Sequence, residues 1–586
     1  MITTMNKFFK YIVPALTLLF GVGFSSCVND LDVTPKDPSL KSLDEITAEQ
    51  LFTKCYAVIG VAGNGGANGD SDVDGIDGGT SGYVRQMWNA NELTTDEAIC
   101  GWGDDGIPQF DYNTYDESHP MLQGFYYRLY TSVYYCNEYL DRYSENDATM
   151  TAEVRFLRAL SYYVLMDCWG NVPFITEPKN ENPPQASRAE VFNFVESELK
   201  EILPDLRVPT ALKKGQDGWG RVDQDAANLL LARLYLNAQV YTGTAHWQEA
   251  KEYAQKVMEG PHKLNTTEVA AEANGIYYAW TPYQMLFMGD NSTTSAATEA
   301  VFPILQDGIR TTSWGTTLFV MASTFDGNMY EYPFDETLTV WTRRKTNGTG
   351  QTWGGNRARP QLVRKFFPLD DAPEYSPGYY TAMSAGDDRA LFNTGVNFTY
   401  QDTTWEDDAK TIIKKIEEKT VDINRGLDCD PVATFAKGYA VAKFNNFKTD
   451  LSSGKDATFP DGDFFLMRSA EAYLTFAEAE FRMNGATQAA IDAINALRDR
   501  AHASQVNAST LNLNFILDEW SREFYFEGRR RIDLIRFDKF GGNNGYNWQW
   551  KGGKFEGKDF PATRNVFAIP ENDMTVNRNL VQNPGY

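Results

Sequence analysis

Residues that commonly bind metals or cross-link a chain are scarce in this sequence. Its 586 residues include four histidines and six cysteines. No H-E-x-x-H or paired-histidine spacing occurs, which disfavours a zinc enzyme. The cysteines lie far apart without a C-x-x-C pair, so neither a metal cluster nor a disulfide framework is expected, and one disulfide is left open. Cys55, Cys136 and Cys168 lie in helical patterns and are predicted to be small core residues.

Positive charge is also scarce. The chain has 54 lysines and arginines against 79 aspartates and glutamates, which gives a formal net charge of −25. Because phosphate recognition needs a basic face, this balance argues against a nucleic-acid partner. It argues equally against attachment to an anionic membrane leaflet by charge. The length exceeds one simple core, so two or more lobes or one extended repeat assembly are expected.

Long apolar runs are missing, except near the start of the chain. Lys7 and Lys10 precede an apolar run over residues 11–24, which is the pattern of a secretory signal with a positive n-region. No later apolar run is long enough to span a membrane. Residues 1–26 are therefore predicted to be a targeting segment.

The small residues Ser25 and Ser26 stand directly before Cys27, and this arrangement resembles a bacterial lipobox. The resemblance implies cleavage before Cys27 and lipidation of that residue, which would tether the protein to a membrane without a spanning helix. Residues 27–43 are polar with two prolines and are predicted to be the lipid-attached tether. The alternative is an ordinary secretory signal in which Cys27 is incidental.

Helical periodicity dominates both ends of the remaining chain, and a different composition fills the middle. Residues 44–262 and 464–586 carry apolar residues at helical spacing, whereas residues 263–463 are rich in Gly, Thr, Asn, Trp and Tyr with only short apolar runs. We therefore predict a mostly α-helical superhelix with a large loop-rich lobe inserted before its last helix pair. The predicted antiparallel pairs are 44–60 with 121–143, 153–168 with 188–203, 223–240 with 247–259, and 464–483 with 486–501.

The first half of the stretch Glu153–Pro178 is predicted to be a buried helix with an abrupt end, and an extended apolar segment follows it. An apolar stripe includes Phe156, Leu160 and Val164, and Gly170 follows where the pattern stops. Arg155 and Arg158, also in this stretch, are predicted to form ion pairs within the superhelix rather than to bind a ligand.

The pair 223–240 and 247–259 loosely resembles a tetratricopeptide repeat, because Ala232, Ala250 and Ala254 occupy its small packing positions. Residues 515–540 are predicted to form one further helix with a solvated, salt-bridged face, since acidic and basic residues recur three and four apart.

Asp70, Asp72 and Asp74 match the opening of a calcium loop of the EF-hand type. The glutamate expected at the twelfth position is replaced by Ser81. These aspartates are a weak calcium candidate, and the alternative is a solvated Asp/Gly turn cluster.

Several segments together resemble one known family. In chain order they are NDLD after Cys27, ELTTDE at 92–97, AEVRFLRALSYYVLMDCWGNVPFI from Ala152, LMRSAEAYLTFAEAE, INALRDRA from Ile494, REFYFEGRRRIDLIRF from Arg522, and the IP…N…L…QNPGY ending. The chain is thus similar to the SusD/RagB family of outer-membrane nutrient-binding lipoproteins of Bacteroidetes.

The resemblance implies a tetratricopeptide-like scaffold and a binding protein rather than an enzyme. Such a protein faces the cell exterior on a lipid anchor, captures oligosaccharide or polysaccharide, and delivers it to a SusC-like TonB-dependent transporter. No organic cofactor is implied.

A sugar ring has an apolar face and a polar rim, so its site needs flat aromatic platforms with polar groups beside them. Tryptophans on glycine-rich loops are the best candidates, and Trp102 is also the position that the resemblance favours. The candidates are Trp102 with Asp104, Trp314, and Trp353 with Arg357; weaker ones are Trp280, Tyr283 and Trp341.

Three alternatives stay open at this point. A RagB-like lid would capture peptides and would need a cavity with charged or backbone contacts. A glycoside hydrolase would need a carboxylate pair such as Asp104 with Glu117, whose separation the sequence does not give. A purely structural surface protein would bind no ligand.

Overall fold

The structure, a computed structural model, describes residues 45–63, 67, 71–73, 76–273, 276–331, 342–344, 347–376, 378–408, 411–429 and 435–586. Cys27 and the predicted signal and tether lie outside these ranges. By its internal contacts the chain divides into two units, Met1–Leu51 and Phe52–Tyr586, and the sheets and the candidate site lie in the second. The predicted boundaries at residues 263 and 463 stay a prediction.

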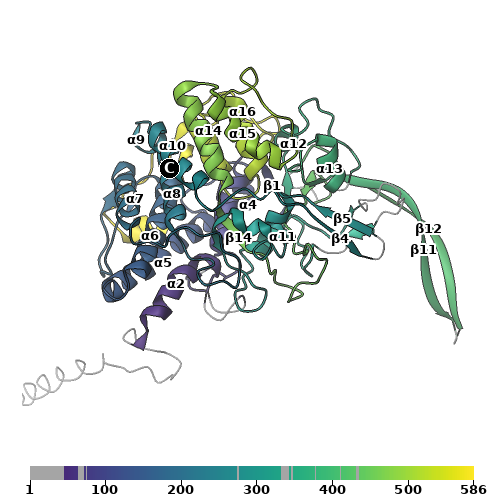
Figure 1. Cartoon of the computed structure of the whole chain (residues 1–586), viewed down its shortest axis with the longest axis horizontal. Helices are drawn as coiled ribbons and strands as arrows, with labels where there is room; N and C mark the ends of the chain where they lie inside the picture. Colours follow the sequence, from purple (N-terminus) through teal and green to yellow (C-terminus); the bar gives the residue numbers. More distant parts are fainter. Residues whose placement is uncertain are drawn as a thin grey trace, which may run out of the picture. The chain divides into compact units, whose positions relative to one another are not determined.

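Helices build most of the second unit (Figure 1). No helix in the described part of the chain has the length and apolar character of a membrane span. The helices are α2 (Ala48–Gly60), α3 (Tyr83–Trp88), α4 (Ile107–Asp111), α5 (Pro120–Tyr143), α6 (Ala148–Trp169), α7 (Arg188–Ile202), α8 (Gln224–Leu236), α9 (Ala238–Thr242), α10 (Trp247–Glu259), α11 (Thr317–Ala322), α12 (Pro360–Arg364), α13 (Gly378–Ala385), α14 (Ala470–Asn484), α15 (Gln488–Arg500), α16 (Leu513–Phe524), α17 (Arg530–Arg536) and α18 (Glu571–Val576).

Packing of neighbouring helices confirms the predicted helical fold. The pairs α6 with α7, α8 with α10, and α14 with α15 form as expected, and α10 also packs along α14. The predicted pairing of α5 with α2 differs, because α5 packs mainly along α6. Phe52 of α2 still contacts α5, with its ring 6.0 Å from that of Tyr139.

Helix α6 lies between α5 and α7 and is buried over most of its length. It begins after Asp147, whose side chain accepts a hydrogen bond from the backbone N–H of Met150, and it ends at Gly170, whose φ of 73° suits glycine. Arg155 and Arg158 pair with Glu198 of α7 at 2.6 Å and 2.8 Å, which confirms the ion pairs predicted for them.

Strands occupy mainly the middle of the chain. One sheet has the order β1 (Ala98–Cys100), β9 (Asn356–Ala358), β13 (Tyr439–Val441), β10 (Phe392–Asn393). The other strands form antiparallel pairs: β2 (Val172–Pro173) with β3 (Gln185–Ala186), β4 (Val269–Ala273) with β5 (Ile276–Trp280), β6 (Ala300–Ile304) with β14 (Phe464–Arg468), β7 (Met329–Glu331) with β8 (Thr342–Arg344), and β11 (Gly395–Asp408) with β12 (Thr411–Asn424).

Two of these pairs differ from the sequence-based expectations. Residues 464–468 were expected to begin a helix, but they form strand β14, which pairs with β6 before α14 starts. Only short strands were expected between residues 263 and 463, but β11 and β12 have 14 residues each. Their hairpin extends away from the other elements of the second unit (Figure 1).

The charged segment 515–540 is not one solvated helix. Phe526, with a φ of 63°, and Gly528, with a φ of 81°, separate α16 from α17. Most of its charged side chains are buried: Glu519 and Glu523 have no exposed surface, and Arg530 keeps 1%. The expectation of ion pairs holds, whereas the expectation of a solvated face is wrong.

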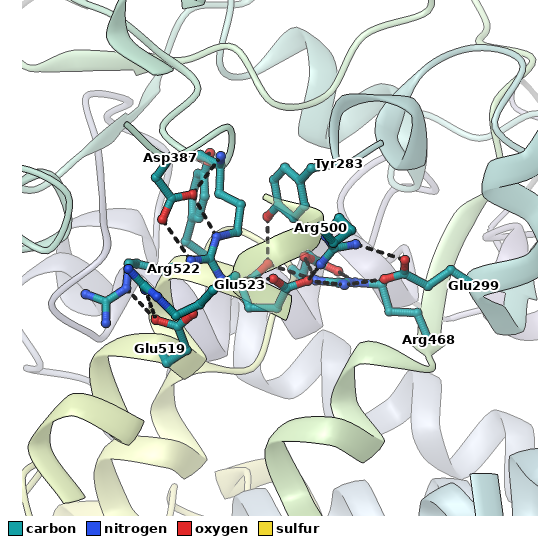
Figure 2. Close-up of polar contacts among 12 residues, drawn as sticks. Tyr283, Glu299, Asp387, Arg468, Arg500, Glu519, Arg522 and Glu523 are labelled. Carbon is teal, nitrogen blue, oxygen red and sulfur yellow. Dashed lines mark hydrogen bonds and ion pairs between the residues drawn. The ribbon is translucent and has the colours of Figure 1, made fainter. Parts of the chain in front are cut away.

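Glu523 is the centre of a buried charge network that joins the helices to the middle of the chain (Figure 2). Its carboxylate pairs with Arg468 of β14 at 2.6 Å, with Arg500 of α15, and with Arg389 at 3.2 Å. Arg468 and Arg500 in turn both pair with Glu299, at 2.8 Å and 2.9 Å. Buried charges are tolerated when each is paired and hydrogen-bonded, as these are.

Candidate functional site

The pairing of β1 with β9 brings two predicted site residues together. These strands are antiparallel, and Cys100 faces Asn356. Trp102 follows β1 by two residues and Trp353 precedes β9 by three, so an antiparallel pair must place both at the same end of the sheet. The Gly101 N–H donates to the carbonyl of Gly355 at 3.1 Å and extends this pairing toward the tryptophans.

Helix α11 brings the third tryptophan to the same place. Trp314 lies three residues before α11 begins, and the segment around Trp353 is fastened to the other end of that helix. The Trp353 N–H donates to the carbonyl of Ala322 at 2.8 Å, and the Gly355 N–H donates to the carbonyl of Ser323 at 2.8 Å. One short helix therefore fixes the spacing between the Trp314 loop and the Trp353 loop.

The three indole rings form a row, which we call the tryptophan row. Trp353 is in the middle, with its ring centroid 6.5 Å from that of Trp102 and 6.3 Å from that of Trp314. The ring planes are inclined by 57° and 35° in these two pairs, and all three side chains are partly exposed. Phe459, also partly exposed, continues the row beyond Trp314 at 4.9 Å.

The Trp102 end of the row is supported from behind. Its ring packs edge-on against buried Phe319 of α11 at 6.4 Å, and its indole N–H donates to the carbonyl of Gly354 at 3.2 Å. A side chain at residue 355 would collide with the Trp102 ring, so glycine is required there by close approach. The platform is thus fixed before any ligand arrives.

Polar groups lie beside the row. Asp104 is exposed and two residues from Trp102. The guanidinium of Arg85 lies 5.8 Å from the Trp102 ring centroid and 5.3 Å from that of Phe319. Burial lowers the pKa of Arg85, and the carboxylates of Asp104 and Asp77 oppose that shift. The Trp353 indole N–H donates a hydrogen bond to the side-chain carbonyl of Gln351 at 3.0 Å.

Three other predicted residues do not join the exposed row. Arg357 lies on β9 with no exposed surface and donates to the carbonyl of Lys437. Trp280 is 7% exposed and its indole N–H donates to the carbonyl of Thr449. Tyr283 is fully buried, with its hydroxyl bonded to the carbonyl of Glu523 at 2.6 Å. Because these three side chains are interior, we leave them out of the site; Trp341 lies outside the described residues.

Sequence reasoning missed Arg85, Phe319 and Phe459. Arg85 and Phe319 lie on helices, whereas the sequence pattern that predicted the site was a tryptophan on a glycine-rich loop. Phe459 lies in a loop, but no glycine flanks it. An arginine within the aromatic segment YVRQMW was the available signal for Arg85.

The calcium candidate is only partly within the described residues, because Asp70 and Asp74 fall outside them. Asp72 is ion-paired with Lys54 at 2.8 Å and with Arg128 at 2.5 Å, so two cations already neutralise its carboxylate. In the described ranges no three His, Cys, Asp or Glu side chains gather as a metal ion would need. The five described cysteines are all buried and free.

The ELTTDE segment is buried and binds the C-terminal charged segment. Glu92 accepts hydrogen bonds from the backbone N–H groups of Gly528 and Arg529 at 2.6 Å and 3.1 Å. Asp96 pairs with Arg530 at 2.8 Å. Burial alone would raise the pKa of Asp96, but the charges of Arg530 and Lys365 outweigh it and lower that pKa. This segment is therefore structural and offers no surface to a ligand.

Two family models match different parts of this chain. A model of the SusD family matches residues 317–586, and a model described as "Starch-binding associating with outer membrane" matches residues 32–236. The starch-binding protein SusD of Bacteroides thetaiotaomicron is 34% identical over 99% of this chain and 100% of its own length.

Solved structures show the same fold. A SusD-like protein from Bacteroides fragilis superposes with a TM-score of 0.62 at 19% identity and covers 94% of this chain and 100% of its own. A laminarin-binding SusD-like protein superposes with a TM-score of 0.59 at 20% identity and covers 92% and 99% of the two chains. With one relative this similar over almost its full length, the chain belongs to the SusD family.

Proposed function

We propose that this protein captures oligosaccharide or polysaccharide at the cell surface through the tryptophan row. The observation that carries the proposal is the convergence of three partly exposed indole rings from separate segments, each held by backbone hydrogen bonds or ring contacts. Exposed, fixed aromatic faces suit the apolar faces of sugar rings. The names of the relatives, starch-binding and laminarin-binding, support a glycan as the ligand class.

The row would bind a glycan by stacking along several sugar units. Because neighbouring ring planes are inclined by 57° and 35°, the row would follow a chain that bends rather than a flat ribbon. Asp104 and Arg85 would supply hydrogen bonds to hydroxyl groups at the Trp102 end. Each stacked ring contact would contribute about 0.5–1.5 kcal/mol.

We further propose that lipid on Cys27 anchors the protein to the outer membrane, facing the exterior, and that the captured glycan passes to a SusC-like TonB-dependent transporter. The description of the matched family model, which includes association with the outer membrane, supports the location. Replacing Cys27 by Ala should abolish incorporation of labelled palmitate and release the protein from membranes. Labelling that persists in this variant would contradict the anchor.

The protein would bind its glycan without cleaving it, since the named relatives are binding proteins. Affinity electrophoresis in gels containing soluble starch or laminarin tests the proposal directly. We expect retardation by at least one glycan and no release of reducing ends on prolonged incubation. Binding to peptides, and to none of a broad glycan panel, would favour the peptide-capturing alternative.

A further inference from the structure

A second groove opens on the helical scaffold, away from the tryptophan row. It encloses about 460 Å³ between α5 and the loop formed by residues 175–183. Its lining shares no residue with the row. In Figure 1, α5 lies at the left and α11, the helix that follows the Trp314 loop, lies nearer the centre. Small-molecule sites commonly enclose about 300–1,000 Å³, so the groove is large enough for sugar units.

An exposed tyrosine forms one wall of this groove. Tyr134 of α5 is 47% exposed, whereas most aromatic side chains in the described part of the chain are buried or half-buried. Its pKa is raised by partial burial and by the nearby Glu138 carboxylate. Glu138 is itself held by Arg142 at 3.0 Å, and the neighbouring ring of Tyr135 packs edge-on at 5.6 Å. The Tyr134 ring therefore packs against Tyr135 and keeps part of its surface open to solvent.

The loop formed by residues 175–183 is the opposite wall, and hydrogen bonds hold it in place. The hydroxyl of Tyr162 accepts a hydrogen bond from the N–H of Ile175 at 2.9 Å and donates to its carbonyl at 2.7 Å. Arg158 donates to the carbonyl of Thr176 at 3.1 Å. At the far end of the loop, Asn577 donates to the carbonyl of Pro183 at 2.9 Å. Hydrogen bonds from separate elements therefore hold both ends of the loop, and the groove exists before a ligand binds.

The rim carries both signs of charge and an amide. Glu177 and Lys179 form an exposed ion pair at 2.7 Å, and Asn180 and Glu181 are exposed beside them. Donors and acceptors around a fixed aromatic face are what the hydroxyl groups and apolar face of a sugar require. The mixed charge offers no strong complementarity to a basic or acidic peptide.

We propose that this groove is a second glycan-binding site, with Tyr134 as its platform. The ligand class rests on the function proposed for the tryptophan row, whereas the site itself rests on the groove. Because a polysaccharide repeats its binding unit, one molecule can occupy both sites, and the second binding event becomes intramolecular. The groove thus selects polymer over short oligosaccharide.

Binding of a polysaccharide and of a short oligosaccharide from it tests this inference in the full-length lipid-free protein. Tyr134→Ala should weaken binding of the polymer at least about tenfold and leave binding of the short oligosaccharide unchanged. Tyr134→Phe keeps the ring and should retain most polymer affinity. Tyr127→Ala is the matched control, because Tyr127 is a partly exposed tyrosine of α5 outside the groove. Melting temperatures of all variants establish that they fold.

The two sites can fail separately. If wild-type protein binds both ligands and Tyr134→Ala binds the polymer equally well, the groove is not a glycan site, while the tryptophan row stands. If the double variant Trp102→Ala, Trp353→Ala still binds the polymer, and adding Tyr134→Ala to it removes that binding, the groove is confirmed. If Tyr134→Ala instead breaks association with the transporter and leaves polymer affinity unchanged, the groove takes a protein and the inference is overturned.

Discussion

The indole rings of Trp102 and Trp353 lie with their centroids 6.5 Å apart and their planes inclined by 57°. They are 251 positions apart in the sequence (353 − 102), and the antiparallel pairing of β1 with β9 brings them together. Trp314 joins them because α11 connects its loop to the Trp353 segment. The candidate site is therefore a product of the central strands and one short helix, which the helical scaffold supports.

The close approach of Gly355 to Trp102 predicts a change in binding without loss of the fold. A Cβ at residue 355 would collide with the indole ring, so Gly355→Ala should displace Trp102 and break the row. We expect glycan affinity to fall roughly tenfold, which is the scale of one lost aromatic contact. Gly103→Ala is the matched control, because a Cβ there meets nothing within 4 Å. Equal affinities for the two variants would show that the position of Trp102 is unimportant.

Removing the central carboxylate of the charge network should greatly lower the free energy of unfolding. Glu523→Gln would leave Arg468, Arg500 and Arg389 short of a buried counter-charge. Breaking a buried pair typically costs about 3–5 kcal/mol, whereas an exposed pair is worth less than about 1 kcal/mol. Glu201→Gln, at an exposed ion pair with Arg155, is the control. Urea unfolding measures both free energies; similar values for the two variants would contradict the account.

Acid should weaken the same network. Burial alone would raise the pKa of Glu519, but Arg389, Arg522 and Arg498 lower it from 4.5 to about 2. A carboxyl whose pKa is lower in the folded state stabilises the fold above its unfolded pKa, and that stability is lost as pH falls toward the folded value. The urea midpoint should therefore fall between about pH 5 and pH 2, and less steeply in Glu519→Gln. An unchanged slope in this variant would exclude Glu519 as a source of the acid sensitivity.

Local sequence patterns predicted most helices, because α6, α7, α10 and α15 each carry an apolar stripe that a helix alone can bury. Local patterns predicted the wrong secondary structure where contacts between distant segments determine it. The five residues of β14 are apolar enough for a strand or a helix, and only pairing with β6 distinguishes the two. Gly528 interrupts the charged segment where Glu92, over 400 residues earlier in the chain, binds its backbone N–H.

The candidate site was predictable only in its residue types. Glycine-flanked tryptophans identified Trp102, Trp314 and Trp353, but their convergence depends on strand register, which no local pattern contains. Arg357 was predicted because it stands close to Trp353 in the sequence. It lies buried because all three residues of β9, the strand between β1 and β13, are buried. The burial of the acidic and basic residues around Glu523 was missed because partners such as Glu299 and Arg500 are 201 positions apart.

The central claim is that the tryptophan row binds glycan, and calorimetric titration of one bound glycan into three proteins tests it most directly. Trp102→Ala, Trp353→Ala protein should bind a short oligosaccharide at least about thirtyfold more weakly than wild type, since buried tryptophan contacts commonly contribute 2 kcal/mol or more. Trp405→Ala removes a tryptophan that is 65% exposed on the β11–β12 hairpin and should bind as wild type does. Wild-type affinity in the double variant would contradict the account.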